Sequence, residues 1–380
     1  MIPGLYLLDN YILKVFLRTL LICFLSFTGL FIVIDVFGNL EEFLRYAEQN
    51  GPRVFLDYYG PRILVFFDQT SHLLALISAM FVMTWMHRAN ELNAVMAAGV
   101  PKQRVVKPLL FAGLAIALIA AVNREVWIPK VRDQLTRNAQ NWMGDQPRPF
   151  TPVFDIRTRI LFTGKGTISA NKEIVQPTFQ LPNQLANWGE VVVGKKSQYL
   201  VANADHPSGY LFESVAAPVN VDQLPAATLK GKPAILTSRD STWLESGQVF
   251  VISDVTFEDL AYGRQFRRFL STGELVRALR NASLDYGADA RVLLHSRMVQ
   301  PLLDCSLLIL GLPLVTRRKS PNVFLACGIA FGLVLLFLGV VMASHTLGGY
   351  FLIRPASLAA WLPLFIFGPC AYVALRRGWE

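Results

Sequence analysis

Six long apolar runs constrain the fold of this chain more than any other feature. A helix needs about 20 mostly apolar residues to cross a bilayer. Runs of this length occupy residues 14–36, 63–86, 104–123, 298–316, 322–345 and 355–375. Hydrophobic residues make up 53% of the 380 and charged residues only 17%, which is well to the apolar side of soluble domains. The sequence therefore predicts an α-helical membrane protein with six transmembrane helices.

Basic residues mark alternate ends of these runs. The clusters are Lys14 and Arg18; Arg88, Lys102, Arg104 and Lys107; Arg317, Arg318 and Lys319; and Arg376 and Arg377. Loops rich in lysine and arginine stay in the cytoplasm, whereas the loop around 36–60 is acidic. We therefore predict two cytoplasmic termini and a long external insertion at 130–297. This topology explains the net charge of +9, and no nucleic-acid motif accompanies that charge.

The external insertion consists of short alternating segments separated by turn residues, a pattern typical of β structure. Strands are predicted at Arg159–Phe162, Glu190–Val193, Gln198–Ala202, Tyr210–Val215 and Gln248–Phe257. In the last of these, one face would carry Val249, Val251, Val255 and Phe257. A sandwich, a jelly roll and an open barrel all fit this spacing. After the strands, Ser271-Thr-Gly-Glu274 is a capping-box pattern that predicts a helix to about Asn281.

Four parts follow from these patterns. Residues 1–129 hold the first three spans, 130–270 an all-β, jelly-roll-like domain, 271–297 a helical connection and 298–380 the last three spans. Between the second and third spans a short amphipathic helix is expected near 87–99, where Leu92, Val95 and Met96 recur at helical spacing. Gly99 and Pro101 end it. Its apolar side is expected either to pack against a partner or to rest among lipid headgroups.

The sequence carries no recognisable catalytic or metal-binding motif. The phosphate-binding pattern G-x-x-x-x-G-K-[ST] is absent, and so are HExxH and CxxC. The four cysteines all lie in predicted spans: Cys23, Cys305, Cys327 and Cys370. We expect a chain that is not itself an enzyme and that has no cofactor or metal of its own.

Several motifs resemble the lipopolysaccharide export permeases of the LptF/LptG (YjgP/YjgQ) family. They are Asp9-Asn-Tyr-Ile-Leu-Lys14, Asn90-Glu-Leu-Asn-Ala-Val-Met-Ala-Ala-Gly-Val100, His295-Ser-Arg-Met-Val-Gln-Pro301 and Leu310-Gly-Leu-Pro313. Their order, and the layout of three spans, a β domain and three spans, extend the resemblance over essentially the whole chain. The stretch Asp35–Leu44 resembles the LptG branch slightly more than the LptF branch.

The resemblance implies a permease subunit of an ABC-type transporter in the bacterial inner membrane. Such a permease pairs with a second permease chain and with a cytoplasmic ATPase dimer that holds ATP and Mg. It extracts lipopolysaccharide and passes it to a periplasmic bridge protein with a similar β domain. The helix near 87–99 would be the coupling helix, in which the ATPase contact is formed by Arg88, Glu91, Leu92, Val95, Met96 and Gly99.

Cargo contacts are less sharply indicated. Acyl chains would need an apolar path, for which Val249, Val251, Val255 and Phe257 are candidates, although an ordinary β core explains them equally well. Basic residues near the outer face could contact the headgroup, and these are Arg45, Arg53, Arg62 and Arg354. Solvated charges or lipid anchors are the alternative. The family places such residues near the outer end of the first span, whereas that region is acidic here.

Within the spans, Asp68 and Asp304 are candidates for a contact between helices or between subunits, because a charge at the bilayer centre is costly. A proton relay through them would instead favour a secondary transporter, and a membrane scaffold that tethers envelope proteins through its β domain is a further alternative. Gly328 and Gly332 form a GxxxG pattern for close helix packing. In the family the first and fifth spans form lateral gates, so this pattern is expected at that seam.

Overall fold

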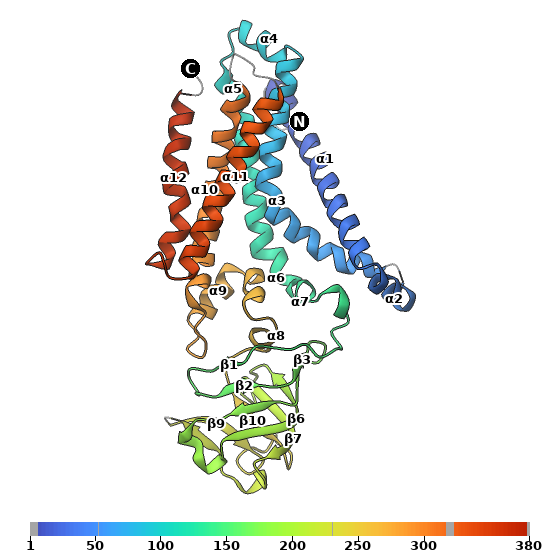
Figure 1. Cartoon of the computed structure of the whole chain (residues 1–380), viewed down its shortest axis with the longest axis vertical. Coiled ribbons are helices and arrows are strands. Elements are labelled where there is room, and N and C mark those ends of the chain that lie inside the picture. Colours follow the sequence, from blue (N-terminus) through green and yellow to red (C-terminus); the bar gives the residue numbers. More distant parts are fainter. Residues whose placement is uncertain (1–6, 52, 230, 317–322, 378–380) are drawn as a thin grey trace. The chain divides into compact units, whose positions relative to one another are not determined.

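The computed structural model describes residues 7–51, 53–229, 231–316 and 323–377 (Figure 1). The chain divides into two compact units, which we call the helical unit (Met1–Val131 and Gly287–Glu380) and the β unit (Arg132–Tyr286). The predicted helical connection at 271–297 is divided between them. The basic loop of Arg317, Arg318 and Lys319 lies outside the described residues.

Among the described residues, six helices are long and apolar enough to cross a membrane, as predicted. They are α1 (Leu7–Gly38), α3 (Arg53–Arg88), α5 (Lys102–Val122), α10 (Gly287–Thr316), α11 (Val323–Gly349) and α12 (Ala356–Arg377). A π-helix, η1 (Asn123–Trp127), and the short α6 (Ile128–Lys130) continue α5. The helices extend past most of the apolar runs, because backbone hydrogen bonds continue a helix through polar turns.

The region around 36–60, predicted as a loop, contains a further helix, α2 (Leu40–Asn50). Its buried Phe43 lies against α3, with ring centroids 4.9 Å from Tyr58 and 5.3 Å from Phe55. Glu41 and Glu42 occupy its first turn, where the helix dipole favours acidic side chains. The aromatic contacts fasten α2 to the start of α3, and this is why the acidic stretch is helical.

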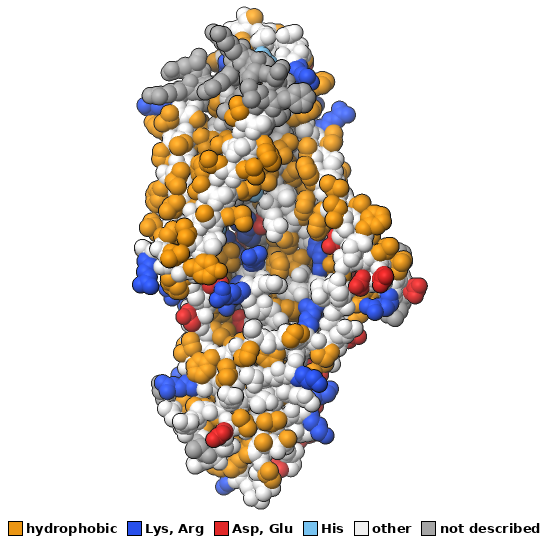
Figure 2. Space-filling view, viewed as in Figure 1, with side chains coloured by type: hydrophobic (Ala, Val, Ile, Leu, Met, Phe, Trp, Pro, Cys, Tyr) orange, Lys and Arg blue, Asp and Glu red, His pale blue; other side chains and the backbone are white. Residues whose placement is uncertain are grey.

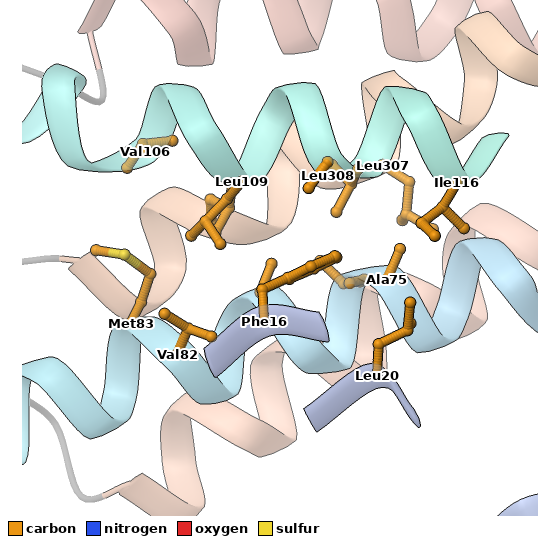
Figure 3. Close-up of a cluster of buried hydrophobic side chains, with 14 of the residues drawn as sticks. Phe16, Leu20, Ala75, Val82, Met83, Val106, Leu109, Ile116, Leu307 and Leu308 are labelled. Atoms are coloured by element: carbon orange, nitrogen blue, oxygen red, sulfur yellow. The ribbon is translucent and has the colours of Figure 1, made fainter. Parts of the chain in front are cut away.

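The core of the helical unit lies among α1, α3, α5 and α10, where large apolar side chains point toward one another (Figure 3). It includes Phe16 and Leu20 of α1, Val82 and Met83 of α3, Leu109 and Ile116 of α5, and Leu307 and Leu308 of α10. Glycines allow α10 to approach its neighbours closely. A Cβ at Gly113 would lie 2.1 Å from a methyl carbon of Leu308, and one at Gly311 would lie 2.4 Å from a methyl carbon of Leu76.

Within the part of the chain that the structure describes, α1 and α11 are the least buried spans. Large apolar side chains of both helices are exposed, among them Leu21, Leu25, Leu30, Leu335 and Leu336. Hydrophobic side chains cover much of the visible face of the helical unit in Figure 2. These surfaces are suited to lipid or to another apolar helix.

The β unit is built on one antiparallel sheet, which confirms the predicted class of the inserted domain. Its described strands are β1 (Val153–Phe154), β2 (Leu161–Thr163), β3 (Gly166–Ile168), β4 (Glu173–Val175), β5 (Thr178–Gln180), β6 (Val191–Leu200), β7 (Gly209–Ala217), β8 (Ala227–Leu229), β9 (Lys232–Thr237) and β10 (Val249–Ile252). The order is β1-β2-β5-β6-β7-β10-β9-β8, and β4 pairs with both β3 and β6.

Two strand predictions need correction. The separate strands expected at Glu190–Val193 and Gln198–Ala202 are one strand, β6, which continues past an irregularity in register at Val193/Gly194. The predicted strand Gln248–Phe257 ends at Ile252, and Phe257 begins helix α8 (Phe257–Phe266). Thr256 caps that helix with a capping box that includes Asp259, and this local signal ends the extended chain.

The segments that enter and leave the β unit are fastened to each other. Arg132, at the start of α7 (Arg132–Leu135), pairs with Glu274 over 2.6 Å. Glu274 belongs to α9 (Thr272–Leu279), whose capping box with Ser271 confirms the predicted helix start. Burial raises the pKa of Glu274, but bonds from the Ser271 backbone and from Arg132 outweigh it and leave the pKa lowered. The carboxylate is therefore held in its charged form.

Candidate functional site

The short helix between the second and third spans is α4 (Glu91–Ala97), at the same end of the helical unit as the start of α1 (Figure 1). It is shorter than the predicted 87–99. Asn90 takes a left-handed conformation, with φ of 57°, and breaks the backbone after Arg88, which is the last residue of α3. Gly99, with φ of 83°, and Pro101 separate α4 from α5. The chain therefore turns sharply both before and after α4.

The apolar side of α4 faces its own chain. Leu92 is only 2% exposed and belongs to the core of the helical unit, while Val95 and Met96 are half-buried against that core. The side chain of Leu92 is thus covered by its own chain in this structure, and its contact with a partner stays a prediction. The exposed surface of α4 and its flanks is small and polar: Arg88, Ala89, Asn90, Asn93, Ala94, Ala97, Ala98 and Gly99.

Glu91 is tied to the first helix. The Tyr11 hydroxyl lies 3.0 and 3.2 Å from the two carboxylate oxygens of Glu91 and donates to them. Glu91 also occupies the first turn of α4, where unpaired backbone N–H groups favour a negative charge. It is half-exposed, so it remains reachable from outside.

An ion pair that the sequence did not predict joins α1 to α5 in the same region. Arg104, near the start of α5, donates to both carboxylate oxygens of Asp9 over 2.7 and 2.6 Å. Asp9 is 4% exposed and shares the buried stripe of α1 with Ile12 and Phe16. An acidic residue at a buried position of an apolar stripe requires a cation, and that signal would have found the pair.

The two aspartates that the sequence singled out within the spans, Asp68 and Asp304, are partnered differently. Arg124, in the π-helix, binds Asp68 over 2.9 Å, whereas Asp304 accepts a bond from Gln300 at 2.8 Å on its own helix. The Asp68–Arg124 pair is a contact between helices, as predicted for Asp68, whereas the printed bond of Asp304 stays on α10. Arg124 was not singled out from the sequence. Its π-helix, a feature frequent at functional sites, realigns the side chains after Val122.

The four arginines proposed for headgroup contact lie on α2, on α3, which holds two of them, and in the turn after α11. Arg45 on α2, Arg53 at the start of α3 and Arg354 in the turn between α11 and α12 are exposed. Arg62 is held differently, because its guanidinium stacks 3.3 Å from the centroid of the Tyr58 ring and donates to the Tyr58 carbonyl. The neighbouring Tyr59 donates to Asp35 at 2.8 Å, so the carboxylate near the end of α1 already has a hydrogen-bond partner.

The four apolar residues proposed for the cargo path are core residues of the β unit. Val249 and Val251 point into the same hydrophobic cluster as Val255 and Phe257, which lie beyond the end of the strand. The other side of β10 is also buried, because Phe250 and Ile252 pack with Leu244 in a separate cluster. The expected half-buried strand is therefore buried on both faces. A contact of these four residues with cargo stays a prediction.

Gly328 and Gly332 lie on the exposed side of α11. A Cβ at either position would meet no other atom within 4 Å among the described contacts. Within the described residues, the GxxxG pattern therefore does not pack against another helix, and this surface could receive a neighbouring molecule.

The described residues contain no group of three or more His, Cys, Asp or Glu side chains that could hold a metal ion. Gly189 to Lys196 comes within one residue of the phosphate-loop pattern, since Lys196 stands where serine or threonine is required. The segment enters strand β6 rather than a helix, and Lys196 pairs with Glu173. It lacks the helix N-terminus that a phosphate loop uses.

Six apolar spans interrupted by an antiparallel β unit, together with a short helix between the second and third spans, define a multi-pass membrane protein with an inserted β domain. A model of the family described as "Lipopolysaccharide export system permease LptF/LptG" matches residues 10–172 and 232–377. The chain therefore belongs to the LptF/LptG family of lipopolysaccharide export permeases and is an inner-membrane protein. No individual curated protein gives a significant match.

Proposed function

We propose that this chain is the permease subunit of an ABC-type transporter that extracts lipopolysaccharide from the inner membrane and passes it to a periplasmic bridge toward the outer membrane. Membership of the permease family supports the cargo. The sequence lacks a phosphate loop, so ATP and Mg are assigned to a partner ATPase. The single observation that carries the proposal is the exposed surface of α4 and its flanks, which combines alanines and a glycine with Arg88, Asn90 and Asn93 while the apolar side of the helix is covered.

The distribution of basic residues supports the orientation that this function needs. Arg88, Lys102, Arg104 and Lys107 surround α4, and basic residues favour the cytoplasmic side. With α4 in the cytoplasm, the alternation of spans puts the β unit in the periplasm and both termini in the cytoplasm. A cytoplasmic ATPase dimer can then reach α4.

The physical chemistry of the cargo supports a role for the β unit. Each methylene exposed to water costs about 0.8 kcal/mol, so lipid A needs an apolar path. Strands β1 and β8 end the main path of the sheet, and such edges can add a strand from another protein. We assign this edge pairing to a bridge protein with a similar β domain. The apolar interior of this chain's own β unit includes Val249 and Val251. It would receive acyl chains only if its packed side chains separate.

The exposed faces of α1 and α11 support pairing with a second permease chain of the same family. Both faces are apolar, and Gly328 and Gly332 leave α11 open to close approach by another helix. Lipopolysaccharide would enter between the two permeases at this seam. The exposed Arg45, Arg53 and Arg354 are then the candidates for headgroup phosphates.

The test is purification of the chain from its native membrane, followed by identification of partners and bound lipid by mass spectrometry. We expect an ATPase dimer, a second permease and lipopolysaccharide, and ATP-driven lipopolysaccharide release after reconstitution in vesicles. Glu91→Ala should abolish release, whereas Glu48→Ala on α2 should not. An isolated chain without ATPase and lipid, or release driven by a proton gradient alone, would overturn the proposal. Full release by Glu91→Ala would overturn the role of α4.

A further inference from the structure

The start of α1 is held by two polar contacts that reach different elements. Tyr11 donates to Glu91 on α4, and Asp9 accepts both bonds from Arg104 on α5. Because α4 lies in the chain between α3 and α5, the two contacts attach α1 to α4 itself and to the helix that follows it. An ATPase could dock on α4 without either of these two contacts, so their presence calls for a separate explanation.

Packing joins the same elements. Ile12 and Phe16 of α1 are fully buried in the cluster that also contains Leu92 of α4 and Val105 of α5. Asp9 lies one turn before Ile12 on this stripe, so its ion pair closes the edge of an otherwise apolar contact. Breaking a buried ion pair leaves an uncompensated charge. The start of α1, α4 and the start of α5 therefore form one packed block.

The remainder of α1 has few buried residues but contacts α3. The ring centroids of Phe24 and Phe67 lie 5.6 Å apart, those of Phe31 and Phe66 lie 5.3 Å apart, and Asp35 accepts a bond from Tyr59. Beyond Leu20, the described buried residues of α1 comprise Thr28 alone, and large apolar side chains there are exposed. A helix of 32 residues is about 48 Å long at 1.5 Å per residue. Because α1 is one continuous helix, a movement of its start is carried toward its exposed part.

We propose that Tyr11, Asp9 and Arg104 are positioning residues that couple α1 to α4. This inference rests on the proposed function, in which an ATPase displaces α4. A displacement of α4 is then transmitted through the Tyr11–Glu91 bond and the Asp9–Arg104 pair to the exposed part of α1, where lipid and the second permease lie. Glu91 thus acts inside its own chain as well as at the surface of α4.

Tyr11→Phe isolates this coupling, because it removes one hydroxyl and keeps the ring. The variant is tested in the complete complex in vesicles that contain lipopolysaccharide, with ATP hydrolysis and lipid release measured together. We expect complex assembly and hydrolysis to persist and the lipid released per ATP to fall about three- to tenfold. Tyr372→Phe, an exposed tyrosine on α12 without such a bond in the described contacts, is the matched control.

Two Asp9 variants separate coupling from a structural role. Asp9→Asn should lower the ratio of release to hydrolysis, and Asp9→Glu should restore most of it by keeping the carboxylate for Arg104. A loss of assembly and hydrolysis in step with release would show a structural role and overturn the inference, as would an unchanged ratio in Tyr11→Phe. A wild-type complex without ATP-driven release would instead overturn the proposed function together with the inference.

Discussion

The Nε atom of Arg124 lies 3.0 and 3.1 Å from the two carboxylate oxygens of Asp68, which joins the end of α5 to the middle of α3. Both side chains are largely buried. Within a bilayer neither charge has water to replace its partner. The pair therefore neutralises Asp68 without any need for a proton relay, and it makes the junction of α3 with the π-helix sensitive to loss of either charge.

Removing one member of this pair should destabilise the helical unit. Asp68→Asn or Arg124→Gln should each cost about 3 kcal/mol, because the remaining charge is left buried and unpaired. The double variant should recover more than half of that loss. Unfolding in mixed micelles measures the change, with the exposed Arg53→Gln as control. Single variants no less stable than this control would show that the pair contributes little.

The sequence predicted the six spans and the β insertion because long apolar runs and alternating strands are local patterns. It did not predict Arg124 as the partner of Asp68, since the two residues lie 56 positions apart and periodicity does not say which helices meet. For the same reason Leu92 was assigned to a partner surface although it faces the core of its own chain. An amphipathic stripe shows that one side of a helix is covered, but it does not show which element or which protein covers that side.

The closeness of neighbouring atoms predicts a different loss of stability for alanine at each of three glycines. A Cβ at Gly348 would lie 2.3 Å from the Cβ of Ala359, which has no rotamer that relieves the clash. At Gly311 the obstacle is a methyl group of Leu76, which can rotate, and at Gly29 nothing lies within 4 Å. Alanine should therefore cost about 2–3 kcal/mol at Gly348, about 1 kcal/mol at Gly311 and nothing at Gly29. Unfolding midpoints in one detergent rank the three variants, and an equal effect at Gly348 and Gly29 would contradict this packing.

Asp222 should make the β unit sensitive to acid. Bonds from the hydroxyls of Ser238 and Ser246 and from the backbone N–H of Gly247 lower its pKa to about 2. Because the folded pKa lies below the unfolded value of 3.8, the stabilisation is complete above about pH 4 and is lost as the pH falls toward 2.

Asp222→Asn should weaken these bonds at neutral pH and remove this part of the pH dependence. Hydrogen exchange at the Gly247 amide should become faster in the full-length variant at pH 7, and its unfolding midpoint should fall less than that of the wild type between pH 4 and pH 2. Asp205→Asn, in another exposed loop, serves as the control. Parallel pH profiles for Asp222→Asn and the wild type would show that this carboxylate does not set the acid response.

The outward glycines of α11 allow pairing to be tested apart from folding. Gly332→Leu places a large side chain at a position where a Cβ would have no contact within 4 Å among the described residues, so the isolated permease should fold with an unchanged unfolding midpoint. If a second permease packs closely on this face, the added side chain separates the helices and recovery of that partner should fall about tenfold. Ala115→Leu on the exposed face of α5 is the matched control. Equal recovery of the partner by both variants would place the seam elsewhere, whereas a loss confined to Gly332→Leu would assign α11 to it.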